Sequence, residues 1–120
     1  MSETPTPKYD LEERTYEFAK CVRQFVKGLA RTICNIEDVK QLVRASGSVD
    51  ANYVEANEAI SKKDFLFRIR LCRKESKESR YSLRLVDTGT DAEIIAQRER
   101  LIAESTELLK KFNAIAHKSQ

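Results

Sequence analysis

An amide and a carboxylate, Asn52 and Glu55, lie three residues apart among small side chains in "QLVRASGSVDANYVEANEAISKKDF", residues 41–65. In a cleft, such a pair could bind a ligand and act in general acid–base catalysis. In a helix, the same spacing places both groups on one side, within reach of a neighbouring helix. A buried carboxylate needs a cation or several donors. We therefore expect Asn52 and Glu55 to fix helix register rather than to bind a ligand, with cations from Arg73, Lys74 or Arg80.

The remaining residues of catalytic type are scattered along the chain. Cys21, Cys34 and Cys72 are odd in number and form no C-x-x-C pair, which argues against a disulfide framework and a zinc site. His117 is the single histidine and lies near the C-terminal end, so a serine or cysteine nucleophile would have one poorly anchored base. The sequence also contains no glycine-rich phosphate loop and no metal motif. We expect no enzymatic activity, no cofactor and no metal.

Charge gives the clearest functional signal. Residues 61–87 carry nine basic and four acidic groups, whereas residues 36–60 carry two and five. Five of the basic residues follow steps of three and four and so form one stripe on a helix: Arg70, Arg73, Lys77, Arg80 and Arg84. A second stripe is expected on the first helix: Lys20, Arg23, Lys27 and Arg31.

Either basic stripe could follow the phosphates of RNA or DNA. The alternative is a solvated face, or salt bridges with the acidic residues 36–60. Most aromatic residues fall on apolar seams, so no platform for stacking bases is expected. Binding would then depend on the phosphate backbone and show little base preference.

Four amphipathic helices must position these groups. Apolar or small residues recur at steps of three and four within residues 10–31, 41–60, 61–87 and 90–117. The seam of the third segment, for example, includes Cys72 and is expected to bury it. Short connections make consecutive helices antiparallel neighbours. The sequence therefore predicts an all-α, up-down antiparallel four-helix bundle.

Local signals set the expected boundaries. Asp10 with Glu13 resembles a capping box at the start of the first helix, after a flexible tail of residues 1–9. Ser61 is expected to cap the third helix. Gly89 is expected to stop it, and Thr90 with Glu93 to cap the fourth helix. One domain over residues 10–117 follows from these boundaries and from the chain length.

The composition fits a helical, cytoplasmic protein. Apolar residues make up 41% and charged residues 34% of the chain, and no apolar run approaches the roughly 20 residues that cross a bilayer. A second apolar stripe on the fourth helix, marked by Ile95, Ile102, Leu109 and Ala116, exceeds what one bundle should hide. Phe67 and Leu71 also lie off the main seam. We expect a homo-oligomer to cover these side chains.

The run from residue 41 to residue 85 resembles the four-helix proteins encoded in intervening sequences of bacterial 23S ribosomal RNA genes. The matching pattern reads Q-L-x-R-x-x-x-S-V-x-A-N-x-x-E-A, then S-K-x-D-F, then K-E-x-x-E-x-x-Y, and these residues carry it: Gln41, Arg44, Ser48, Asn52, Glu55, Ser61, Asp64, Phe65, Lys74, Glu75, Glu78 and Tyr81. The chain departs from the family at Leu29-Ala30, where a Leu-Pro pair is common, and at Ser82, where Trp is common.

The resemblance implies a helical bundle that assembles into a pentameric ring. It also implies a relation in fold to the accessory protein of diversity-generating retroelements, which binds a reverse transcriptase and nucleic acid. The family has no agreed catalytic residues, so the resemblance informs the fold more than the function. We therefore expect a non-enzymatic, nucleic-acid-associated or adaptor protein. The alternative is a protein-protein interaction scaffold that binds no nucleic acid.

Overall fold

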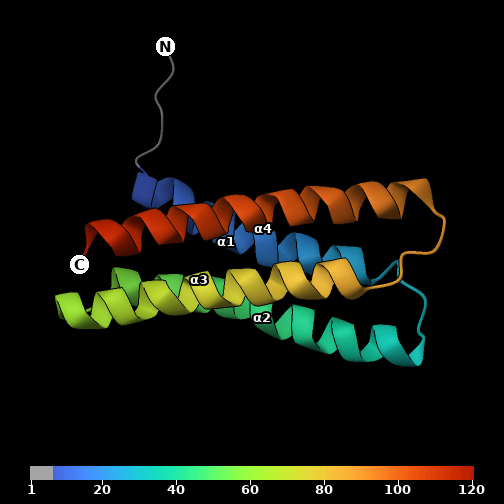
Figure 1. Cartoon of the computed structure of the whole chain (residues 1–120), viewed down its shortest axis with the longest axis horizontal. Coiled ribbons are helices and arrows are strands. Elements are labelled where there is room, and N and C mark those ends of the chain that lie inside the picture. The colour runs from blue at the N-terminus through green and yellow to red at the C-terminus, as the bar shows by residue number, and fades with distance from the viewer. Residues whose placement is uncertain (1–6) are drawn as a thin grey trace, which may run out of the picture.

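The computed structural model describes residues 7–120, with side chains from residue 11 onward, and this part of the chain contains four helices and no strand. They are α1 (Pro7–Val26), α2 (Ile33–Asn57), α3 (Lys62–Leu85) and α4 (Ala92–Lys118). Successive helices run in opposite directions (Figure 1). Helix α1 packs on α2 and α4, and α3 packs on the same two helices. Helices α1 and α3 therefore occupy opposite corners of a four-helix bundle.

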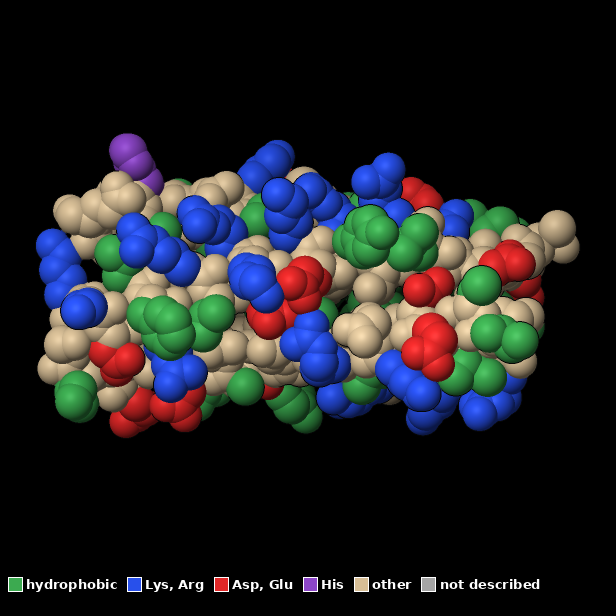
Figure 2. Space-filling model, turned by 60° about the horizontal axis from the view of Figure 1, so that its bottom comes forward, with side chains coloured by type: hydrophobic (Ala, Val, Ile, Leu, Met, Phe, Trp, Pro, Cys, Tyr) green, Lys and Arg blue, Asp and Glu red, His purple; other side chains and the backbone are tan. Residues whose placement is uncertain are grey.

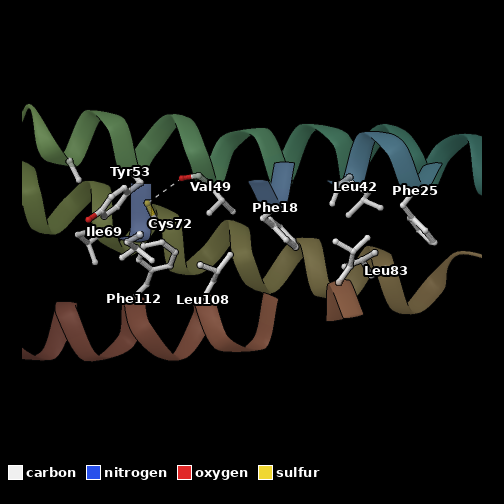
Figure 3. Packing of buried hydrophobic residues seen from close by; sticks show 14 of the residues in the cluster. Phe18, Phe25, Leu42, Val49, Tyr53, Ile69, Cys72, Leu83, Leu108 and Phe112 are labelled. Carbon is white, nitrogen blue, oxygen red and sulfur yellow. Dashed lines mark hydrogen bonds between the residues drawn. The ribbon is translucent and has the colours of Figure 1, made fainter. Parts of the chain in front are cut away.

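The seams expected from the sequence form the core (Figure 3). Phe18, Val22 and Phe25 of α1 are buried, as are Leu42 and Val49 of α2. Helices α3 and α4 contribute matching sets: Ile69, Cys72, Leu83, Leu101, Leu108 and Phe112. The rings of Tyr53 and Phe112 meet across the bundle with centroids 6.0 Å apart. Burial of these side chains is the main force that holds the four helices together.

Small polar residues occupy several positions in these seams. Ser46, Ser76, Ser79 and Ser105 are fully buried. Each hydroxyl donates a hydrogen bond to a carbonyl one turn earlier in its own helix, at 2.8 to 3.3 Å. The short side chains let neighbouring helices approach, and the local hydrogen bonds leave no hydroxyl unpaired.

Three helix starts carry a cap in the structure. Thr32 caps α2. Ser61 caps α3 by accepting from the Asp64 amide, and this cap was predicted from the sequence. The cap of α4 is Asp91, which accepts from the amides of Glu93 and Ile94. The prediction of Thr90 was therefore wrong by one residue. The Asp91 carboxylate is a strong cap because its charge also suits the positive end of the helix dipole.

Other boundaries also differ from the prediction. Helix α1 begins at Pro7, before Asp10. Proline suits a helix start because the backbone N–H groups of the first turn have no acceptor within the helix, so the N–H that proline lacks costs no hydrogen bond. Of the expected tail, residues 1–6 lie outside the described residues. Helix α2 ends at Asn57, so Ile60 is not on its seam and is 95% exposed. Gly89 lies in the α3–α4 connection with φ 66°, a backbone conformation that favours glycine.

Asn35 joins two connections that are far apart in the sequence. Its side chain is 2% exposed, and its amide nitrogen donates to the carbonyl oxygens of Ala30 and Asp87 at 3.0 and 2.9 Å. Its amide oxygen accepts from the Asp87 backbone nitrogen at 2.8 Å. One buried side chain therefore fastens the α1–α2 connection to the end of α3, at the end of the bundle opposite the α2–α3 turn.

Candidate nucleic-acid interface

Four of the five basic residues predicted on the third helix line one groove between α3 and α4, which we call the α3–α4 groove. Its volume is about 640 Å³. Arg70, Arg73, Lys77 and Arg80 line it together with Lys74, and no carboxylate does so among the described residues. Arg84, the fifth, lies beyond the groove on the same side of the helix. Figure 2 shows Lys and Arg side chains spread along the molecule, with Asp, Glu and apolar side chains between them.

Helix α4 holds two of these guanidinium groups in place. Arg73 donates to the Asn113 side-chain oxygen at 3.2 Å, and Arg80 donates to the Thr106 hydroxyl at 3.3 Å. Neither bond neutralises the charge. Both arginines therefore keep a full positive charge and an oriented donor set that a phosphate could use.

The remaining residues of this stripe have no polar partner in the described part of the chain. Arg70, Lys77 and Arg84 are exposed and make no ion pair there. A solvated face, one part of the expected alternative, fits the exposure of these three residues. Salt bridges to the acidic residues 36–60, the other part, do not form in the described chain. The physical reason is the orientation of the stripe, which turns toward α4 and away from α2.

The second basic stripe does not join the first. Helix α1 is at the corner opposite α3, and it ends at Val26, so Lys27 lies in the turn that follows. Lys20 lies over the Tyr16 ring, 6.0 Å from its centroid. Arg23 donates to the Ala19 carbonyl at 3.2 Å, and its guanidinium lies against Gly47 of α2, 3.3 Å from the place of a β-carbon there. Three differently directed cations do not make a continuous phosphate track.

Asn52 contacts the neighbouring helix, but Glu55 does not. The Asn52 amide nitrogen donates to the Ser48 carbonyl and hydroxyl, and its oxygen accepts from Arg68 of α3 at 3.0 Å. Glu55 is exposed and has no ion-pair partner in the described chain. The expectation of a buried, paired Glu55 is therefore wrong. Glu55 lies three residues after Asn52, and this step around the helix turns its side chain away from α3 and toward solvent.

The carboxylate that α3 buries against α2 is Glu75. Arg44 of α2 contacts Glu75 at 3.3 Å and Glu78 at 2.8 Å, and Lys74 contacts Glu78 at 2.9 Å. The Glu75 side chain is only 9% exposed. A hydrogen bond from Lys74 lowers the pKa of Glu78 below its ordinary value. All four residues belong to the sequence pattern that carries the family resemblance, and they meet at one place on the α2–α3 surface.

The second apolar stripe of the fourth helix is partly covered by the bundle. Ile95, Ile102 and Leu109 are half-buried, and Ala116 is buried. Ile102 packs against the core, and Leu109 lines the α3–α4 groove. The oligomer expected to cover this stripe stays a prediction. The uncovered apolar side chains of α3 are Phe67, as expected, and also Tyr81 and Leu85, which are 54%, 62% and 52% exposed.

A second groove, between α1 and α4, has a mixed electrostatic character, because Arg14 and Arg100 line it together with three carboxylates. Its volume is about 650 Å³, and Glu13, Glu17 and Glu104 are among its lining residues. Arg14 spans it with two hydrogen bonds to Glu104, at 3.0 and 2.8 Å. The carboxylates would repel a polyanion. Of the two grooves, the α3–α4 groove is the one suited to phosphate.

Residues 7–120 also lack a candidate metal site and a membrane-spanning helix. No group of three or more candidate metal ligands occurs in this part of the chain. No helix there is long and apolar enough to span a bilayer.

Comparison with known proteins identifies the family. Residues 8–116 match the family described as 23S rRNA-intervening sequence protein. A crystal structure of a protein of unknown function from the S23 ribosomal protein family of Bacteroides thetaiotaomicron VPI-5482 has a similar fold, with a TM-score of 0.76 and 26% sequence identity over 92% of this chain and 97% of the other. No curated protein shows significant similarity. The chain belongs to the family of 23S rRNA-intervening sequence proteins.

Proposed function

We propose that the protein binds RNA or DNA by its phosphate backbone, through the α3–α4 groove. The observation that carries this proposal is the convergence of five cationic side chains, of which only Lys74 has an acidic partner, in one groove whose described lining contains no carboxylate. Phosphate contacts supply most of the affinity of non-specific nucleic-acid binding. Arg70 and Lys77 have no competing acid to displace, so contact with a phosphate would cost them little beyond side-chain ordering.

We also propose that several copies of the chain assemble. The family resemblance implies that they form a pentameric ring. Tyr81 and Leu85 leave uncovered apolar surface on α3, beside the cluster that Arg44 forms with Glu75 and Glu78. Surface of this kind often marks a protein interface. A ring would present one basic groove per copy, and simultaneous contacts would raise the affinity for a long polyanion.

Charge reversal tests the nucleic-acid proposal. The variant Arg70→Glu with Lys77→Glu should abolish binding to a fluorescent oligonucleotide in a polarisation assay. The matched control is Lys20→Glu with Lys27→Glu, which makes the same change in net charge on the far corner of the bundle. The control should bind nearly as well as the parent. Equal losses of oligonucleotide binding in both variants would show that only net charge matters and would contradict binding in the α3–α4 groove.

The second candidate function is a protein-binding scaffold, for which the exposed Tyr81 and Leu85 are the supporting observation. A reverse transcriptase, or another protein that itself handles nucleic acid, is the kind of partner that the resemblance suggests. Tyr81→Asp should then disturb assembly, measured by light scattering, without touching the α3–α4 groove. A parent protein that is a monomer of 13.8 kDa at micromolar concentration would contradict the assembly proposal.

A non-enzymatic role in the cytoplasm remains part of the proposal. It rests on the scattered catalytic residue types in the sequence, where His117 is the single histidine. Turnover of RNA or DNA during a long incubation with the purified protein would contradict it.

A further inference from the structure

The α3–α4 groove contains apolar surface as well as cations. Phe67, Leu71 and Leu109 line it beside the five basic residues. A site that only follows phosphates gains nothing from an uncovered aromatic ring. Yet the Phe67 side chain is 54% exposed, at a position where the solvent-facing side of a helix normally carries a polar residue. Most aromatic residues were expected on the apolar seams, but this ring lies uncovered in the groove.

The Phe67 ring has a fixed neighbour. The Arg68 guanidinium lies over it, 5.6 Å from its centroid. Arg68 is itself held by its hydrogen bond to Asn52 of α2, at 3.0 Å. An aromatic ring beside an oriented guanidinium is a common platform for unpaired bases, because a base stacks on both kinds of planar group. Asn52 acts here as a positioning residue, which restrains Arg68 and through it the ring.

We propose that the α3–α4 groove takes an unpaired strand of RNA or DNA, whose phosphates contact Arg70 and Lys77 while a base stacks on Phe67. The proposal rests on the nucleic-acid binding proposed above and adds the kind of strand. In a duplex the base faces are covered by their neighbours and cannot reach the ring. Every base has such a face, so the preference is for unpaired over paired strands and not for one sequence.

Affinity measurements with matched probes test this preference. The probes are a fluorescent strand of about 16 nucleotides, the upper range for one single-strand site, its duplex, and an abasic strand with the same number of phosphates. The parent should prefer the base-bearing strand to both others. Phe67→Ala should weaken binding of that strand roughly tenfold and leave the abasic strand unaffected. Phe67→Tyr should restore binding, because the ring is kept.

Tyr81 provides the control. It is an exposed aromatic residue on the same helix but does not line the groove, so Tyr81→Ala should bind the base-bearing strand as the parent does. Equal affinity of Phe67→Ala and parent for that strand would overturn the inference and leave backbone binding intact. A tenfold loss that also occurs with the abasic strand would overturn it as well. A parent that binds none of the probes would refute the proposed function and this inference together.

A direct reporter of stacking is also available, because the chain contains no tryptophan. Phe67→Trp introduces a single indole into the groove, and a stacked base should quench its fluorescence. Saturation with the base-bearing strand should quench the signal strongly, and saturation with the abasic strand should not. Tyr81→Trp should respond to neither. Similar quenching at both positions, or none at position 67 when the strand is bound, would contradict stacking on Phe67.

Discussion

Replacing Asn35 by alanine should destabilise the bundle more than any change on its surface. The substitution removes three hydrogen bonds at 2.8 to 3.0 Å and leaves the Asp87 backbone nitrogen and two carbonyl oxygens without their partner. Each buried group left unpaired costs about 1–3 kcal/mol. Ala30 and Asp87 are exposed, so their carbonyls can turn toward water and recover part of that cost. A total of about 3 kcal/mol follows, at the lower end of the range for each group.

Urea denaturation followed by circular dichroism would measure this loss in the free energy of unfolding. In a thermal melt of the same variant, the midpoint should fall by roughly 10 °C. Asn35→Asp should be at least as destabilising at neutral pH, because it loses both donors and places a charge beside two carbonyls. Cys34→Ala is the control, since Cys34 is the exposed neighbour in the same turn. A change of less than about 0.5 kcal/mol in Asn35→Ala, the range of ordinary surface changes, would refute the reasoning.

Three further predictions follow from single side chains. Glu55→Ala should change the free energy of unfolding by no more than about 0.5 kcal/mol because the side chain is exposed. A loss of several kcal/mol in urea denaturation would instead support a buried, paired Glu55. Burial raises the pKa of Cys72 to about 12, so a thiol reagent should label Cys21 and Cys34 in the folded protein and Cys72 only after unfolding; labelling of all three at one rate would contradict the described core. The lowered pKa of Glu78 means that its contacts with Lys74 and Arg44 stabilise the fold above the ordinary carboxyl range and are lost as the pH falls through the lowered pKa. Lys74→Met should therefore lose less stability than the parent between neutral pH and about pH 3, and identical losses would contradict this account.

Much of the fold could be predicted from the sequence because its apolar seams are nearly uninterrupted. Phe18, Val49 and Leu83 are buried as their spacing indicated, and Ser61 caps α3 as its position before Asp64 indicated. Periodicity states which residues share a side of a helix. It does not state which neighbouring helix that side meets. For this reason the whole apolar stripe of the fourth helix was assigned to an oligomer interface, although Ile102 packs against the core of its own bundle.

The candidate site was predictable in its charges and less so in its surroundings. The spacing of Arg70 and Lys77 put them on one side of a helix, and they do line one groove. The second stripe could not be placed, because only the packed structure shows that α1 lies at the corner opposite α3. Asn35 was missed because its partners are backbone groups 5 and 52 residues away. Phe67 was noted as lying off the seam, but the groove beside it is a product of tertiary packing.

The salt dependence of binding decides whether phosphate contacts hold nucleic acid in the α3–α4 groove. Each phosphate that a cation neutralises contributes about −0.7 to the slope of log K against log salt for a single strand. If most of the five lining cations contact phosphate, the parent should show a slope of about −3 with an unpaired strand. Arg70→Glu with Lys77→Glu should bind too weakly for a slope to be measured at any salt concentration of the titration. A parent affinity that does not change with salt, or no binding at about 50 mM salt, where phosphate contacts are strong, would contradict the proposal that this groove binds nucleic acid.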